Sequence, residues 1–229
     1  MDDLRIRHRP VVDAGKLVGV LSDRDLLEIP EGSGLVSEVM HADVATVTPD
    51  TSSVTLAVEI VMRGIGCLPV LENETLVGIV TELDILRAYA GVAREGKLTG
   101  NVDPPIETLM TKNVRTLAPT DTLADAFALL KELNARHAPV VSEAKLLGIL
   151  SDRDLRRAHG NGLPNETPVA DVMTKDVRTL EPSEVLSKAA ELMVEHRISA
   201  LPVVGSDEGE LVGILSSTDV VEHCLGTLR

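Results

Sequence analysis

One pattern of about sixty residues recurs four times along this 229-residue chain, so any fold must accommodate four similar structural units. The segment RHRPVVDAGKLVGVLSDRDL begins at Arg7, and RHAPVVSEAKLLGILSDRDL begins at Arg136. The two segments align without a gap at an offset of 129 residues. All four copies share a proline, which is Pro10, Pro69, Pro139 or Pro202. They also share an apolar run with a central glycine, which is Gly19, Gly78, Gly148 or Gly213. Each copy then ends on a Ser or Thr with Asp three residues later. We call this pair the closing motif, and its four examples are Ser22–Asp25, Thr81–Asp84, Ser151–Asp154 and Ser216–Asp219.

Three copies carry a further upstream part, which reads VMHADVATVTPD from Val39, LMTKNVRTLAPT from Leu109 and VMTKDVRTLEPS from Val172. Each gives a Met, a short β-type run and a Pro-bounded turn, and the runs end at Thr46, Thr116 and Thr179. A helix is then predicted, because apolar residues recur at spacings of three and four, in the third copy at Leu123, Ala126, Phe127, Leu130 and Leu133. Two short strands joined by a polar turn follow, and a second helix starts at the Ser or Thr. The complete copy therefore predicts the order β-α-β-β-α and an α+β fold.

The first copy is incomplete, because Met1 aligns with Leu130, inside the first helix of the third copy. Either the true start lies upstream of Met1, or a partner chain or altered packing covers the gap, and the sequence leaves these alternatives open. Copies one and three share SDRDL and a preceding Arg-His, whereas copies two and four share Leu-Pro-Val. We therefore expect two odd–even pairs. The predicted copies are residues 1–29, 36–90, 106–159 and 169–225, in modules 1–90 and 106–229 joined by a linker at 91–105.

Composition limits the classes of partner. The formal net charge of −14 argues against nucleic acid or an anionic membrane, because both need a basic footprint. With one Phe, one Tyr and no Trp, the core must be aliphatic, and aromatic platforms for a bound base are missing. Cys67 and Cys224 are too few for a disulfide framework and are read as buried or half-buried thiols in a reducing compartment. The charged start, MDDLRIRHRP, does not fit a signal peptide, so a cytoplasmic location is predicted.

The closing motif has a structural and a functional interpretation. It resembles a capping box, in which the hydroxyl caps a helix and the acid lies in the first turn. The same helix N-terminus offers free N–H groups to a phosphate, and the Asp can accept both hydroxyls of a ribose. The two interpretations are compatible, because the Ser can cap in the empty state and the Asp can accept a ribose when one binds.

Basic residues gather around the odd copies of this acidic chain. They are Arg7, His8, Arg9 and Arg24 in the first copy and Arg136, His137 and Arg153 in the third. Such side chains suit phosphate oxygens, with surface ion pairing as the alternative for Arg24 and Arg153. The even copies carry Gly66-Cys67 and Ser199-Ala200 at the matching positions, so we expect their sites to hold a nucleoside less strongly.

The fourfold pattern resembles the CBS domain, the cystathionine-β-synthase-type motif. The resemblance covers nearly the whole chain and rests on the V-x-T-h-x-P segment, the L-P-V-type strand and the G-h-h-[ST]-x-x-D ending. It implies that pairs of motifs pack through their sheets into two Bateman modules, whose clefts bind AMP, ADP or ATP and, less often, S-adenosylmethionine. It also implies a disc-like homodimer.

The resemblance assigns roles residue by residue. Ribose contacts fall on Asp25, Asp84, Asp154 and Asp219. Phosphate or ribose contacts fall on Ser22, Thr81, Ser151 and Ser216, and Thr46, Thr116 and Thr179 would lie near the base or ribose. The first pair lacks the strand for a fourth Thr, which puts one of its clefts in doubt, so the second pair is the better predicted site.

Function is predicted to be regulatory and non-catalytic. The sequence shows no H-x-x-x-H, no Cys cluster and no G-x-x-x-x-G-K-[ST] loop, so neither a metal nor a tightly bound cofactor is expected. The repeats use up the chain, and we expect the regulated partner to be another protein or a second copy. The alternatives are a dimerisation scaffold without a ligand and a divalent-cation sensor around Glu72, Glu74 and Glu82.

Overall fold

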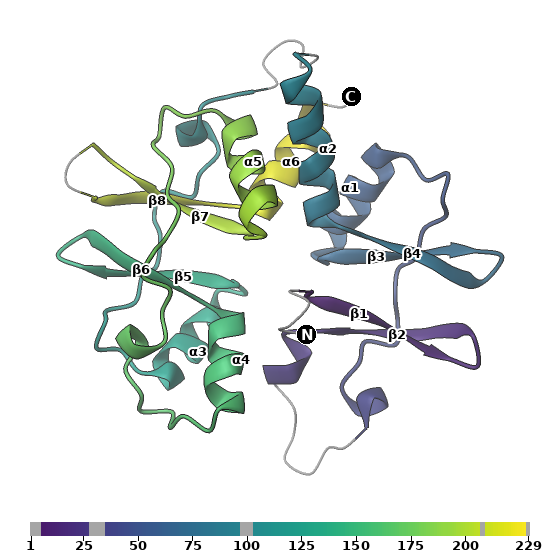
Figure 1. The fold of residues 1–229 in the computed structure, drawn as a ribbon, viewed down its shortest axis with the longest axis horizontal. Coiled ribbons are helices and arrows are strands. Elements are labelled where there is room, and N and C mark those ends of the chain that lie inside the picture. The colour runs from purple at the N-terminus through teal and green to yellow at the C-terminus, as the bar shows by residue number, and fades with distance from the viewer. Residues whose placement is uncertain (1–5, 28–34, 97–102, 207–208, 228–229) are drawn as a thin grey trace. The chain divides into compact units, whose positions relative to one another are not determined.

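A computed structural model describes residues 6–27, 35–96, 103–206 and 209–227. Each copy contributes one antiparallel hairpin, drawn as paired arrows in Figure 1. The hairpins are β1 (His8–Asp13) with β2 (Lys16–Ser22), β3 (Cys67–Glu72) with β4 (Thr75–Thr81), β5 (His137–Ser142) with β6 (Lys145–Ser151), and β7 (Ala200–Val204) with β8 (Leu211–Ser216). In each hairpin the repeated proline lies opposite a Val or Ile, as Pro10 does opposite Val20, and a bulge follows one residue later in the first strand. The four copies therefore share one register.

Helices flank the hairpins of the complete copies, in agreement with the predicted α+β class. They are α1 (Ser53–Arg63), α2 (Glu82–Arg94), α3 (Leu123–Glu132), α4 (Asp152–Gly160), α5 (Leu186–His196) and α6 (Ser217–Thr227). Short 3-10 turns are η1 (Asp25–Leu27), η2 (Val36–Glu38), η3 (Ile106–Thr108) and η4 (Val169–Asp171). None of the helices in the described ranges is long and apolar enough to cross a membrane.

The prediction of a strand upstream of the first helix is wrong. In each of the three copies concerned, one parallel bridge takes the place of the expected strand. The bridges join Val47 to Val70, Leu117 to Val140 and Leu180 to Val203. A proline follows two residues after each upstream bridging residue and lacks the N–H that a ladder requires, which ends the pairing.

Two helix predictions also need correction. In the first copy the described residues of the predicted second helix form only the 3-10 turn η1, and residues 28–34 lie outside the described part. In the third copy Leu133 does not join the buried face of α3. The helix ends at Glu132, Asn134 adopts a positive φ of 49°, and Leu133 is 41% exposed. The other predicted positions of that face are buried or half-buried.

The core is aliphatic, as the composition predicted. Its fully buried large side chains include Leu68, Val140, Leu150, Leu201 and Leu215, all from the hairpins. Small residues on the helices, Ala57, Ala126 and Ala189, are also fully buried, which lets the helices approach the sheets closely. Apolar burial of this kind is the dominant stabilising contribution to folding.

The chain divides into two compact units. Unit 1 comprises Met1–Asp103, Ala190–Ser199 and Ser217–Arg229, and unit 2 comprises Pro104–Ala189 and Ala200–Ser216. In unit 1 the strands form one sheet in the order β1-β2-β4-β3, and α6 packs against α1 and α2 (Figure 1). Unit 2 holds the β5–β6 and β7–β8 hairpins, joined by a bridge between Lys145 and Glu210. The predicted module boundaries stay a prediction.

Both cysteines are buried, which agrees with their interpretation as buried thiols. Burial, and secondarily the Glu82 carboxylate, raises the pKa of Cys67 to about 12, and burial raises the pKa of Cys224 to about 12. A thiol with so high a pKa is almost wholly protonated at pH 8, and only the thiolate is a good nucleophile.

We therefore expect a chromogenic disulfide reagent at pH 8 to leave Cys67 and Cys224 unmodified in the folded protein. Unfolding in urea should restore ordinary thiol pKa values and expose both sulfurs, so that both then react within minutes. Absorbance of the released thiolate measures the reaction. Rapid modification of either thiol without denaturant would contradict the burial.

Candidate functional site

An extended segment before the first helix of copies two, three and four crosses to the hairpin of the neighbouring copy. We call these segments arms, and they are residues 36–47, 106–117 and 169–180. The residue after each arm's methionine forms an antiparallel bridge, namely His41 with Val20, Thr111 with Ile214 and Thr174 with Ile149. The arm then returns to its own copy through the parallel bridges described above. Arms therefore link copy one with copy two and copy three with copy four.

Repeated glycines make room for the methionines of the arms. A Cβ added at Gly148 would lie 2.7 Å from both the Met173 sulfur and the Thr174 carbonyl oxygen. Gly19 and Gly213 are crowded in the same way, by Met40 and Met110. These glycines are needed because another chain segment approaches the strand closely.

Two of the closing motifs form the predicted caps at the starts of α-helices. Thr81 and Ser151 each build a capping box with the Asp three residues later, at the starts of α2 and α4. The Ser151 N–H and hydroxyl donate to Asp154 Oδ2 over 2.9 and 2.6 Å, and the Asp154 N–H donates back to Ser151 Oγ. Ser22 and Asp25 exchange the same backbone-to-side-chain bonds although no α-helix is described there. In the fourth copy Ser216 ends β8 and Asp219 lies in the first turn of α6.

The sites at Asp25, Asp84 and Asp154 differ in what the Oδ1 atom of the aspartate contacts. Asp25 Oδ1 lies 3.0 Å from His41 Nε2, and Asp84 Oδ1 accepts a 2.7 Å bond from Arg87. Every hydrogen bond that the described ranges record for the Asp154 side chain falls on Oδ2. Asp154 Oδ1 can therefore accept a ligand hydroxyl without first losing a basic partner.

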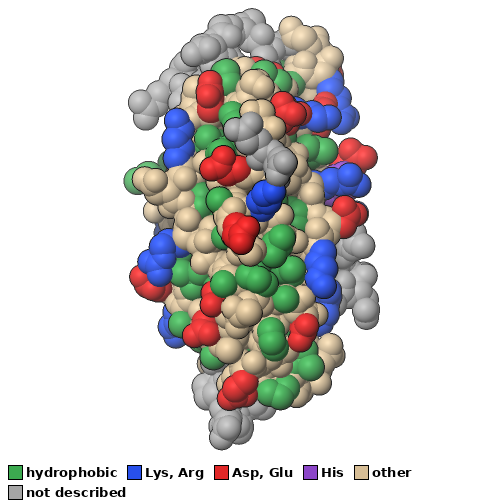
Figure 2. Space-filling view, turned by 90° about the vertical axis from the view of Figure 1, so that its left-hand side faces the viewer, with side chains coloured by type: hydrophobic (Ala, Val, Ile, Leu, Met, Phe, Trp, Pro, Cys, Tyr) green, Lys and Arg blue, Asp and Glu red, His purple; other side chains and the backbone are tan. Residues whose placement is uncertain are grey.

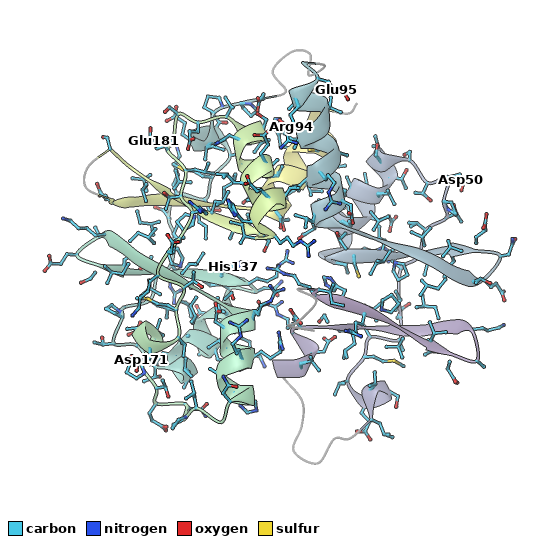
Figure 3. The ribbon with its side chains drawn as sticks, viewed as in Figure 1. Asp50, Arg94, Glu95, His137, Asp171 and Glu181 are labelled. Carbon is cyan, nitrogen blue, oxygen red and sulfur yellow. The ribbon has the colours of Figure 1, made fainter. Side chains whose placement is uncertain are left out.

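The predicted basic residues lie at fixed positions relative to the closing motifs. His8 pairs across its hairpin with Ser22, and His137 pairs with Ser151, at the start of β5 (Figure 3). Both histidines are half-buried. Arg9 is exposed and follows His8 in β1, so strand alternation directs it to the other face, away from Ser22.

The remaining predicted residues lie around the same positions. The carbonyl of Arg136 accepts the N–H of Asp152 over 3.1 Å, which closes the hairpin next to the cap, and Arg24 and Arg153 occupy the third position of the closing motif, half-buried. Thr116 and Thr179 are half-buried beside the bridges of their arms, whereas Thr46 is exposed.

Two functional features escaped the sequence argument. One is His41, which reaches Asp25 from an arm. The other is the residue directly after the closing Ser or Thr. The buried polar or charged side chains of the described ranges all occupy this position, and they are Asp23, Glu82, Asp152 and Ser217. Glu82 accepts bonds from the Ser217 and Thr218 hydroxyls over 2.9 and 3.1 Å within unit 1. The recurrence of a polar residue directly after the closing Ser or Thr was the available signal.

The cation-sensor alternative finds no support at the carboxylates that suggested it. Glu82 is buried against hydroxyls, Glu74 pairs with Lys16 on the surface, and Glu72 is exposed at the end of β3. In the described part of the chain, no group of three or more His, Cys, Asp or Glu side chains is placed to hold a metal ion. Figure 2 shows one face on which acidic, basic and apolar side chains are scattered, with no continuous basic patch on that face.

Comparisons with known proteins agree with this repeat. A family model described as the CBS domain matches residues 1–32, 36–91, 106–161 and 169–226. Protein MJ1225 of Methanocaldococcus jannaschii is 26% identical over 97% of this chain and 89% of its own, and its crystal structure superposes with a TM-score of 0.82 at 24% identity. An uncharacterised conserved protein of Pyrococcus horikoshii superposes with a TM-score of 0.71 at 30% identity, over 94% of this chain and 90% of that one.

A third similar structure holds a ligand. It is CBSX2 in complex with AMP, which superposes with a TM-score of 0.50 at 32% identity, over 55% of this chain and 98% of that one. Four family matches in tandem, spread over most of the sequence, coincide with the four hairpins of the fold. The chain therefore belongs to the CBS domain family and carries four tandem CBS motifs.

Proposed function

We propose that this chain is a non-catalytic regulatory protein that binds an adenine nucleotide, AMP, ADP or ATP, at its closing motifs. The observation that carries the proposal is the state of Asp154, whose Oδ2 is held by the Ser151 cap while Oδ1 has no recorded bond within the described ranges. A carboxylate fixed in this way is oriented before a ribose arrives. Preorganisation of this kind reduces the cost of binding.

The surroundings of Asp154 suit the rest of a nucleotide. The carboxylate lies in the first turn of α4, where N–H groups and the helix dipole favour an anion. His137 lies across the hairpin from Ser151 and can donate to a phosphate oxygen when protonated. The likeness to the AMP-bound CBSX2 pair supports the same ligand class for this chain.

The other sites are expected to bind more weakly. A ribose at Asp25 must displace His41, and one at Asp84 must displace Arg87. We therefore place the tightest site at Asp154. S-adenosylmethionine is a less favoured ligand, because it lacks the phosphates that the basic side chains would neutralise.

Regulation requires that the nucleotide bind two arrangements of paired motifs with different affinity, since equal affinity shifts no equilibrium. A partner protein would then respond to the arrangement that the nucleotide favours. We propose that the protein acts in the cytoplasm as a homodimer.

We expect AMP, ADP or ATP to stabilise the protein against unfolding. A ligand present at a hundred times its dissociation constant should add about 2.7 kcal/mol to the free energy of unfolding. Urea unfolding in the presence of each nucleotide, S-adenosylmethionine or magnesium measures the effect. Magnesium acting alone would favour the cation sensor, no shift with any compound would favour the scaffold, and steady hydrolysis of ATP would contradict the non-catalytic role.

A further inference from the structure

The exchange of arms is incomplete at one hairpin of unit 1. The repeated glycine is buried in β2, β6 and β8, each of which is covered by an arm, but Gly78 of β4 is exposed. We propose that the edge of β4 around Ile79, beyond the single pair that joins Thr75 to Lys16 of β2, is a docking site for an extended polypeptide segment that carries the arm pattern. That pattern is a methionine followed seven residues later by an aliphatic residue, as in Met40 and Val47.

The covered hairpins show what such a segment does. In unit 1 the arm places Met40 against Gly19, and His41 exchanges two backbone hydrogen bonds with Val20 over 2.9 and 3.0 Å. In unit 2 the other two arms make the same pair of bonds with Ile149 and Ile214. Methionine fills the small space above a glycine, and the backbone bonds add a short strand to the hairpin edge.

β4 presents the same edge without an arm. A Cβ at Gly78 would meet only Val70, at 3.8 Å or more. Ile79 occupies the position of Val20 and is 36% exposed, whereas Val20 is 7% exposed. Within the described ranges no segment bridges Ile79 on its outer side. β4 pairs with β2 only at Thr75, so the stretch around Ile79 is an unpaired strand edge, and such an edge is a template for a further strand.

A second vacancy lies on β1 of the same sheet. In the other three hairpins the end of an arm donates to the proline carbonyl and accepts from the N–H two residues later, as Val47 does with Pro69 and Leu71. Pro10 and Val12 occupy these positions in β1, and the described ranges record no such arm there. Val12 is 46% exposed.

A third vacancy involves η2. The first residues of η3 and η4, Ile106 and Val169, are fully buried, and their N–H groups donate to carbonyls just before the first helix of the neighbouring copy. The matching residue of η2, Val36, is 47% exposed. All three vacancies correspond to contacts that the first half of a complete copy makes elsewhere in the chain, so one segment with the arm pattern can fill them together.

A polypeptide segment with the arm pattern is the occupant that the contacts favour. A small apolar ligand could cover Gly78 but could not exchange backbone hydrogen bonds with Ile79. In a second copy of this chain, the three arms of the described ranges are already engaged at Val20, Ile149 and Ile214, so none of these three is spare.

Residues 104–120 of the chain, PPIETLMTKNVRTLAPT, provide a probe with the arm pattern of an odd copy. As a fluorescent peptide they should bind the full chain saturably at one-to-one stoichiometry, measured by anisotropy. Binding should be at least about tenfold weaker for a Met110→Asp peptide, because this peptide loses the apolar contact with Gly78. It should be weaker by at least the same factor for a Gly78→Val protein, because the added side chain occupies the space that the methionine would fill. Thr75→Val, at the other end of β4, is the matched control and should bind normally.

Amide hydrogen exchange tests the site without a variant. The Ile79 N–H should exchange at least about tenfold faster than that of Ile149 in the protein alone and slow when the peptide is added. Equal peptide binding by wild type and Gly78→Val, or no binding at all, would overturn the proposal. So would protection of Ile79 that disappears as a dimer dissociates on dilution, since a second copy would then be the occupant.

Discussion

Replacement of Gly148 by alanine should lower the free energy of unfolding by about 1–3 kcal/mol, the usual cost of overpacking. The added Cβ would lie 2.7 Å from the Thr174 carbonyl oxygen as well as from the Met173 sulfur. The methionine can bend away, but the carbonyl cannot, because Thr174 and Ile149 exchange two backbone hydrogen bonds over 2.9 and 3.0 Å. The strand must separate from the arm or distort. Urea unfolding followed by circular dichroism measures the change.

The matched control is Gly78→Ala, the same substitution at the same position of the repeat. There the new methyl group meets Val70 at ordinary contact distance, and φ at Gly78 is not in the left-handed region. Loss of glycine's conformational freedom should leave the stability unchanged or raise it by up to about 1 kcal/mol. A Met173→Ala, Gly148→Ala double variant should recover only part of the loss, since the carbonyl remains. Equal effects at Gly148 and Gly78 would refute the role assigned to the arms.

Local sequence patterns predicted most elements of this fold because each pattern acts over a few residues. The Ser151–Asp154 cap needs only a three-residue spacing, and the buried face of α3 follows from spacings of three and four. The exception at Leu133 also has a local cause, the left-handed turn at Asn134, but nothing in the helical spacing marks it.

The contacts that distinguish the sites could not be predicted, because they join residues far apart in the chain. His41 meets Asp25 only after an arm crosses to another hairpin, and Glu82 meets Ser217 across 135 positions. The sequence shows that methionines and glycines recur with the repeat, but not that Met110 covers Gly213. The odd–even differences led us to expect that copy one pairs with copy two and copy three with copy four, but they do not show which segment of one copy crosses to which strand of the other.

Asp154→Ala should weaken nucleotide binding about ten- to a hundredfold, because hydrogen bonds to a charged group contribute about 1.5–3 kcal/mol. The variant also loses part of a helix cap, so a control must separate the two effects. Asp125 provides it, since Thr122 donates to Asp125 Oδ2 from its N–H over 3.0 Å and from its hydroxyl over 2.6 Å, the geometry of Ser151 and Asp154. The Thr122 hydroxyl, and next its N–H, lower the pKa of Asp125, which is therefore ionised at neutral pH.

The comparison of Asp154→Ala with Asp125→Ala decides between a cap and a ligand contact. Both variants remove the acid of a capping box in unit 2, so both should weaken the start of their helix. Only Asp154→Ala should reduce affinity in calorimetric titration with AMP or ATP, and Asp154→Asn should fall between it and wild type, because the amide oxygen still accepts one bond. Asp84→Ala should have a smaller effect, since Arg87 already holds the oxygen that a ribose would need. Equal affinity losses for Asp125→Ala and Asp154→Ala would mean that the closing motif serves only to start a helix.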